Sequence, residues 1–258
     1  VEYDMVSGTT RMPRPQLARI RDGCTKILAG ERDLKHAQSL LGIITWAAQC
    51  MPAISPFISR LWRVTTTAQQ LHKQKITTPQ GVIDDMRWWL SALHAGLGSD
   101  GRAIIPTQRL VSHTAEADAG TEWGIGGLDN ARYYNAPLPA SVRRRAIKNK
   151  RESSTFLELY NLLVMARVMG PGWTGHHVRV HVDNSALPRY ARKGRGSNET
   201  ESDMIREILL LQVRHSWSWE LQWVPRELNE AADALSKQDM ERFHKWAPTH
   251  RLPPDVPS

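Results

Sequence analysis

Residues 110–135 read LVSHTAEADAGTEWGIGGLDNARYYN, and this stretch decides the fold. From residue 110 to residue 118 the side chains alternate with the period of two that is typical of a strand. The segments 123–128 and 131–135 follow after short turns rich in Gly, Asp and Asn, which predicts two further strands. The stretch therefore predicts an antiparallel meander of three strands.

Downstream of this meander, helical and strand patterns alternate. In chain order we expect a helix at 153–169, a strand at 178–182, helices at 184–192 and 201–215, a strand at 219–224 and a helix at 229–237. A meander followed by such alternation is typical of an α/β fold. We expect a mixed five-stranded sheet with helices flanking both faces.

Upstream, the first hundred residues show helical patterns separated by prolines. After a short extended opening with a turn at Ser7–Gly8, we expect helices after Pro15, before Pro52, at 56–71 and after Thr78, with Thr78 as N-cap and Pro79 at the first helical position. Trp88 and Trp89 form a pair on the predicted helix after Thr78, and aromatic residues in such an apolar helical pattern favour packing in a core over base stacking. This part is predicted to be a small all-helical subdomain.

Composition limits the classes of protein to consider. The 258 residues carry 34 Lys and Arg against 26 Asp and Glu, a net charge of +8, which makes nucleic acid the leading class of partner. Only Cys24 and Cys50 are present, so a disulfide framework or a zinc site is not expected. No signal peptide opens the sequence, and polar residues and prolines interrupt the uncharged segment 37–59, which argues against a membrane span.

Four acidic residues stand where the predicted elements would converge. Asp118 ends the first strand, Glu158 lies one turn into the long helix, Asp183 ends the strand 178–182, and Asp233 lies on the last helix. Each acid taken alone could be a turn, cap or surface residue. Together, in apolar surroundings, they favour a site for divalent cations, which take oxygen ligands and relieve the repulsion between clustered carboxylates.

These segments, in this order and spacing, resemble the ribonuclease H domain of retroelement reverse transcriptases. The resemblance rests on ADAGTEWGIGG, FLEL, HVDNSA and WVPRELNEAADALS, and it covers residues 110–238. The opening EYDMVSGTTRMPRPQLARI is similar to the last hairpin of a polymerase palm entering the thumb. SLLGIITWAAQCMPAISPFISRLW and DDMRWWLSAL resemble the thumb and linker of DIRS-like, tyrosine-recombinase retrotransposons of the Ngaro and VIPER type.

The resemblance implies a division of the chain into four parts. Residues 1–28 would be the end of the palm hairpin and the first thumb helix, 29–108 the helical thumb or connection, 109–246 a domain of ribonuclease H-like fold, and 247–258 a tail. The aspartates of the polymerase would lie upstream of Val1, so no polymerase active site is expected here. The upstream polymerase domain of the same polyprotein would be a partner.

The implied activity is metal-dependent hydrolysis of the RNA strand of an RNA/DNA hybrid. Asp118, Glu158, Asp183 and Asp233 would be catalytic and would hold two Mg²⁺ ions, with Mn²⁺ as an alternative. Glu158 and its neighbours would also contact the 2′-hydroxyl that distinguishes RNA from DNA. Localisation would be intracellular, in the cytoplasm or the nucleus, without a membrane partner.

Two features depart from the family pattern. Many ribonucleases H carry a histidine shortly before the last aspartate, but no histidine occurs between His215 and Asp233. Turnover would then be slow, or another group would take the histidine's place. The basic helical protrusion that some relatives use to bind the hybrid is also missing, because only RKGRGSN joins the two helices after Asp183.

Basic runs on both sides of the acids offer another surface for nucleic acid. The residues expected to bind it are Arg143, Arg144, Arg145, Lys148, Lys150, Asn184, Arg192, Lys193, Arg195 and Trp123. The run at 143–151 could equally be a solvated loop or a nuclear-import signal, since basic clusters are motifs of low specificity.

Two other functions compete with ribonuclease H. One is a domesticated, non-catalytic scaffold that binds nucleic acid, against which the presence of all four acids argues. The other is a DNA-cutting nuclease on the same fold, such as a resolvase or integrase core, against which the thumb-like segment and the position of Glu158 argue. Mg²⁺ should stabilise a nuclease and leave a scaffold unaffected.

Overall fold

The computed structural model describes residues 2–4, 9–50, 52–98, 102–103, 111–120, 122–130, 132–148 and 153–246. The chain divides into two compact units, residues 1–108 and residues 109–258, which are described in turn. None of the helices in the described residues is both long and apolar enough to cross a membrane.

Unit 1 combines helices with a small sheet. Its helices are α1 (Arg14–Leu28), α2 (Leu34–Cys50), the 3-10 helix η1 (Pro52–Phe57), α3 (Ser59–Gln70) and α4 (Gln80–His94). Its described strands β1 (Glu2–Asp4), β2 (Thr9–Arg11) and β3 (Arg102–Ala103) pair antiparallel in that order. The β1–β2 hairpin lies in the predicted extended opening, and the predicted helices follow it. Strand β3 departs from the all-helical prediction for the rest of the unit, and it is too short to show a strand period in the sequence.

In unit 1 the predicted N-cap of α4 is wrong, whereas the predicted packing of two tryptophans is confirmed. Thr78 is not the N-cap of α4: Pro79 holds that position, and its carbonyl oxygen accepts the first helical bond from the backbone N–H of Val82 at 2.9 Å. The prediction that Trp88 and Trp89 pack in the core is confirmed, because both indoles are buried and Trp88 stacks on Phe57.

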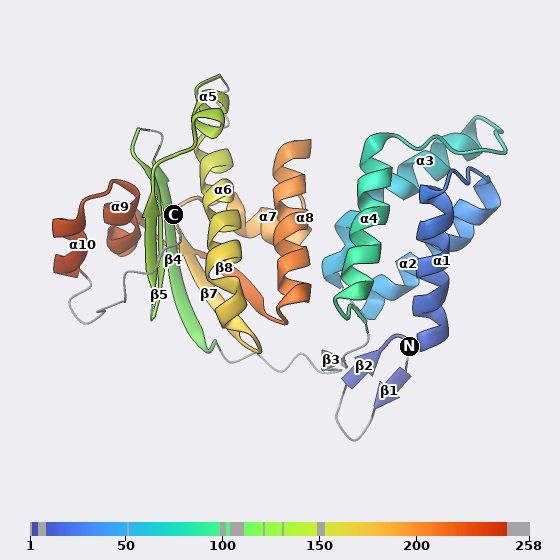
Figure 1. Cartoon of the computed structure of the whole chain (residues 1–258), viewed down its shortest axis with the longest axis horizontal. Helices are drawn as coiled ribbons and strands as arrows, with labels where there is room; N and C mark the ends of the chain where they lie inside the picture. Colours follow the sequence, from blue (N-terminus) through green and yellow to red (C-terminus); the bar gives the residue numbers. More distant parts are fainter. Residues whose placement is uncertain are drawn as a thin grey trace. The chain divides into compact units, whose positions relative to one another are not determined.

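Unit 2 is built on a mixed sheet. The strands are β4 (His113–Gly120), β5 (Gly124–Asp129), β6 (Tyr133–Ala136), β7 (His177–Val182) and β8 (Ser218–Trp223). Within the described residues the sheet order is β6-β5-β4-β7-β8, with β4, β5 and β6 antiparallel and β4, β7 and β8 parallel (Figure 1). The predicted meander and five-stranded mixed sheet are confirmed, and the arrangement is that of a ribonuclease H-like fold.

Helices cover both faces of this sheet. They are α5 (Ala140–Lys148), α6 (Ser153–Val168), η2 (Gly170–Trp173), α7 (Leu187–Lys193), α8 (Glu199–Arg214), η3 (Arg226–Leu228), α9 (Glu230–Ser236) and α10 (Met240–Trp246). The sequence patterns predicted neither α5 nor α10. In α5 the consecutive arginines leave only Val142 and Ala146 at helical spacing to pack against the core, and such a short apolar pattern is easily missed.

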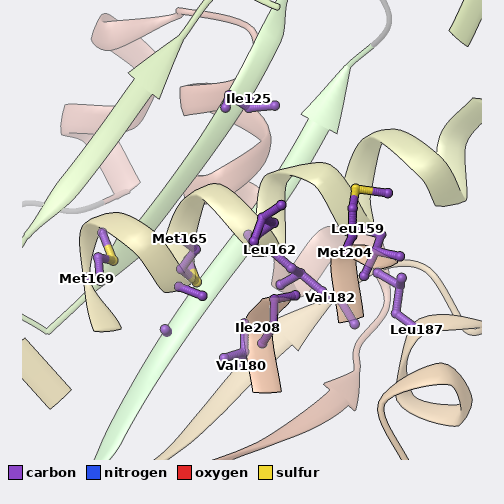
Figure 2. Packing of buried hydrophobic residues seen from close by; sticks show 14 of the residues in the cluster. Ile125, Leu159, Leu162, Met165, Met169, Val180, Val182, Leu187, Met204 and Ile208 are labelled. Atoms are coloured by element: carbon purple, nitrogen blue, oxygen red, sulfur yellow. The ribbon is translucent and has the colours of Figure 1, made fainter. Parts of the chain in front are cut away.

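The main core lies between the sheet and α6. Leu159, Leu162 and Met165 of α6 point toward the strands and toward α8, where Val180 and Ile208 meet them (Figure 2). Because α6 is apolar on almost all sides, it is buried between neighbouring elements rather than lying on the surface. This packing fixes the face of α6 that carries Glu158.

Helix α9 packs on the opposite face of the sheet, against β4 and β5, and it needs Gly126 to do so. A Cβ atom on Gly126 would lie 2.5 Å from both the Cβ atom of Leu235 and the backbone nitrogen of Ser236. Such a distance forces backbone or side chains to move. Gly126 therefore allows the close approach of the helix that carries Asp233.

We expect Gly126→Ala to lower the free energy of unfolding by about 1–3 kcal/mol, because the added methyl group pushes α9 away from the sheet. Urea unfolding of the purified protein measures this. Gly42→Ala is the matched control, since a Cβ atom there meets nothing within 4 Å and alanine favours the helix. Equal stability of the Gly126 variant and the wild type would contradict the close packing of α9.

Candidate active site

The four predicted acids come from four elements of unit 2. Asp118 lies in β4 and Asp183 directly after β7, and the carboxyl ends of these parallel neighbours share one edge of the sheet. Glu158 comes from α6 and Asp233 from α9, on opposite faces. Asp118, Glu158 and Asp233 are 6%, 8% and 2% exposed. This burial excludes the interpretation of Glu158 and Asp233 as surface acids.

The charges of these acids act on one another. Burial above all, with the charges of Asp183 and Asp118, raises the pKa of Glu158 to about 9. Burial also raises the pKa of Asp118, against a hydrogen bond from Ser236, and the charges of Asp183 and Asp233 add to the rise. The four carboxyl groups therefore form one electrostatic cluster, although they are up to 115 residues apart in the sequence.

Glu158 has one carboxyl oxygen without a donor. Its Oε1 atom lies 3.4 Å from the side-chain nitrogen of Asn184, which also donates to the hydroxyl of Thr155 at 3.1 Å. Its Oε2 atom is buried, and no hydrogen-bond partner for it exists among the described residues. An orphaned buried acceptor of this kind requires an explanation, and a cation bound by the carboxylate would provide one.

Asp233, in contrast, is fully paired. Arg226 donates to its Oδ1 atom at 2.5 Å, and Lys237 and Arg242 each donate to its Oδ2 atom at 2.8 Å. Burial acts to raise the pKa of Asp233, but Lys237 and Arg226 outweigh it and hold the pKa below its usual value. Arg242 also pairs with Glu230, which ties α10 to α9.

The four carboxylates are suitable ligands for a divalent cation, but their side chains are not arranged around a common position for a metal ion. In the part of the chain that the structure describes, no three His, Cys, Asp or Glu residues are arranged to hold a metal ion. Asp118 accepts a hydrogen bond from Ser236, and Asp233 faces its three cations. All candidate ligands are nonetheless carboxylate oxygens, which Mg²⁺ and Mn²⁺ prefer, and the Oε2 atom of Glu158 is unpaired. Binding a metal at Asp233 requires that carboxylate to release one of its cations.

The described part of the first basic run, up to Lys148, is a helix and not a loop. Arg143, Arg144 and Arg145 are exposed on α5. Arg145 donates to the hydroxyl of Thr200 at the start of α8, and its guanidinium lies 5.3 Å from the centre of the Phe156 ring. The side chain of Lys148, and all of Lys150, lie outside the described residues.

The second basic run lies near the first. Arg192 and Lys193 end α7, Arg195 follows in the loop to α8, and all three side chains are exposed. The contact of α5 with Thr200, five residues further along, brings the two runs to the same side of unit 2. Trp123, in the turn between β4 and β5, is 56% exposed.

The structure adds residues that the sequence patterns missed. Arg226 stands in the segment where a histidine was expected, and Lys237 is one helical turn after Asp233, so both could have been found from the sequence. Arg242 lies beyond the motif that carried the resemblance, and only the fold of α10 onto α9 brings it to Asp233.

Parts of the chain are similar to known proteins. Residues 169–239 match a family model described as reverse transcriptase-like, a range that includes Asp183 and Asp233. No curated protein sequence matches the chain. A solved structure described as the foamy viral protease-reverse transcriptase dRH in complex with double-stranded DNA is similar at 13% identity and a TM-score of 0.29, over 82% of this chain and 35% of that one. This chain thus spans about a third of that protein's length.

Proposed function

We propose that unit 2 is a divalent-metal-dependent endonuclease that hydrolyses the RNA strand of RNA/DNA hybrids. The observation that supports this most strongly is the cluster of four carboxyl groups from β4, α6, α9 and the end of β7, with the Oε2 atom of Glu158 unpaired. The reverse transcriptase-like match over residues 169–239 supports the same function. The chain would act as the C-terminal part of the reverse transcriptase of a DIRS-like retrotransposon.

The four acids would hold two Mg²⁺ or Mn²⁺ ions. Bound metal ions supply an activated water and stabilise the leaving oxygen in phosphodiester hydrolysis. Asn184 orients Glu158, and the Ser236 hydroxyl orients Asp118. Arg226 is 61% exposed while its guanidinium reaches Asp233, so it is the candidate to take the place of the missing histidine.

Glu158 and its neighbours would also read the sugar of the cleaved strand. Asn184 holds Glu158 through its side-chain nitrogen, and groups of this kind can contact a 2′-hydroxyl, which only RNA carries. An all-DNA duplex should therefore resist cleavage. Cleavage of such a duplex at a rate comparable to that of the hybrid would refute this role.

The hybrid would be bound by α5 and by the end of α7. Replacing both Arg143 and Arg144 by Glu is expected to weaken hybrid binding and to reduce the slope of log affinity against log salt by about 2, because each lost phosphate contact removes about one counterion. Fluorescence anisotropy across a salt series measures both quantities.

The matched control for this variant changes the same number of charges away from α5 and α7. Arg214 and Lys245 are exposed in the last turns of α8 and α10, and replacing both by Glu should leave the salt slope nearly unchanged. If the Arg143 and Arg144 variant keeps the wild-type affinity and salt slope, α5 is not the binding surface.

The activity itself is tested with a labelled RNA/DNA hybrid in Mg²⁺ or Mn²⁺, alongside double-stranded RNA and double-stranded DNA. Cleavage confined to the RNA of the hybrid is the expected result. The upstream polymerase domain of the same polyprotein would help to hold the hybrid, inside the cell in the cytoplasm or the nucleus, so adding that domain in trans is expected to raise the rate.

A second function has one observation in its favour. Three cations neutralise Asp233 in this arrangement, as would suit a non-catalytic scaffold of ribonuclease H-like fold that binds nucleic acid. A folded protein that binds the hybrid and cuts it in neither metal would establish this alternative.

A further inference from the structure

A single amide in the core connects the elements that carry the candidate metal ligands. Asn161 lies on α6, three residues after Glu158, and its side chain is fully buried. Its Nδ2 atom donates to the carbonyl oxygen of Asp118 in β4 and to that of Gly126 in β5, both at 2.8 Å. Its Oδ1 atom accepts a hydrogen bond from the hydroxyl of Tyr134 in β6 at 2.6 Å.

Asn161 lies among apolar side chains, where the hydrogen bonds of its amide matter for stability. The next residue on its helix, Leu162, belongs to the apolar core, where an unpaired amide is strongly disfavoured. Both the nitrogen and the oxygen of the Asn161 amide form hydrogen bonds, and their partners lie in the three neighbouring strands β4, β5 and β6. A fully satisfied polar group in a core stabilises one arrangement of the packed elements against alternatives that slide or rotate.

Asn161 stabilises the position of α6 relative to β4, and these two elements carry Glu158 and Asp118. Residues three apart on a helix lie on the same face, so Asn161 and Glu158 both face the sheet. Asn161 bonds to the backbone of Asp118 itself. A shift of α6 along the sheet would therefore break these hydrogen bonds before it changed the distance between the two carboxyl groups by much.

We propose that Asn161, supported by Tyr134, is a positioning residue that fixes Glu158 relative to Asp118 for metal binding. This inference rests on the proposed function insofar as it takes the acid cluster to be a metal site, and it does not require that the hybrid be cleaved. Its readout is therefore the affinity for Mn²⁺ alone, measured by isothermal titration calorimetry on the full chain.

Asn161→Leu removes both donors and keeps a side chain of similar size. It is expected to weaken Mn²⁺ binding by about 10- to 100-fold, as is usual when a group that orients a metal ligand is lost. Tyr134→Phe removes only the hydroxyl that holds the Oδ1 atom and should weaken binding less. Circular dichroism and thermal unfolding establish that each variant is folded.

Leu163→Ala is the matched control. Leu163 is buried on the same helix and belongs to the same core, but its side chain makes no hydrogen bond. Its truncation lowers stability by leaving a cavity and should leave the Mn²⁺ affinity within about twofold of wild type, since no orienting group is removed. A positioning role predicts that the Asn161 and Leu163 variants differ in metal affinity even where their melting temperatures are alike.

Every outcome decides the proposal. Wild-type Mn²⁺ affinity in a folded Asn161→Leu protein, or an equal loss in Leu163→Ala, would overturn it. If Asn161→Leu does not fold, Tyr134→Phe decides by the same comparison. If the wild type binds Mn²⁺ and leaves the hybrid intact, the proposed hydrolysis fails and the positioning role is still judged on affinity. If the wild type binds no Mn²⁺, the acids are not a metal site and the positioning role is overturned.

Discussion

Asp118→Asn is expected to lower the rate of hybrid cleavage by on the order of 10³-fold or more, because it removes one carboxylate from a site whose metal ions supply several kcal/mol of transition-state stabilisation. Asp118 is the acid whose charge acts on Glu158 and whose own pKa responds to Asp183 and Asp233. The charge of Asp118 therefore interacts with those of the other three acids. Asparagine keeps its size and can still accept the Ser236 hydrogen bond.

The measurement is cleavage of end-labelled RNA in the hybrid, with hybrid binding measured in parallel. Binding should stay near the wild-type value, because the basic residues of α5 and α7 are unchanged. Glu241→Gln, an exposed acid on α10, is the control for loss of a negative charge and should cut at the wild-type rate. Retention of cleavage by Asp118→Asn would mean that the cluster is not the catalytic site.

The elements that converge on this cluster could be predicted because their sequence patterns are local. Alternation in 110–118 and the run of apolar residues around Glu158 are sufficient to place a strand and a buried helix, and both are confirmed. The convergence of the four acids follows from the topology, since β4 and β7 are parallel neighbours. Local patterns do not specify the order of the strands in the sheet, which became evident only from the structure.

The partners of the acids that lie far away in the sequence could not be predicted in the same way. The hydrogen bond from Ser236 to Asp118 joins residues 118 positions apart, and no local pattern specifies such a contact. No sequence pattern singled out Asn161, a polar residue in a mostly apolar stretch of α6. Its acceptors in β4 and β5 became evident only once the fold placed these strands beneath α6.

Glu158→Gln is expected to stabilise the metal-free protein at neutral and alkaline pH. The pKa of Glu158 is about 9 in the folded state, against 4.5 as the ordinary value. Because the folded state holds the proton more tightly, this group's contribution to stability is complete below about pH 4.5 and is lost as the pH rises through 9. Glutamine is neutral throughout and does not pay this penalty.

At pH 8 to 8.5 with EDTA the variant should therefore be more stable than wild type by a few kcal/mol, since each pKa unit corresponds to about 1.4 kcal/mol. At pH 5 the two proteins should be nearly equal. Urea unfolding at pH 5, 7 and 8.5 gives the comparison, with Glu241→Gln as the control for a lost surface charge. Parallel stability profiles for wild type and Glu158→Gln would show that Glu158 is ionised in the folded protein.

Adding Mg²⁺ should reverse the order of stability. A metal ion that binds only the folded protein stabilises it in proportion to the logarithm of its concentration over Kd, and it must displace the proton from Glu158, so its affinity should rise with pH. The wild type should gain stability with Mg²⁺ at pH 8.5 and gain little at pH 5, whereas Glu158→Gln should gain little at either. An equal gain in both proteins would place the metal away from Glu158, and the unpaired Oε2 atom would then need a different explanation.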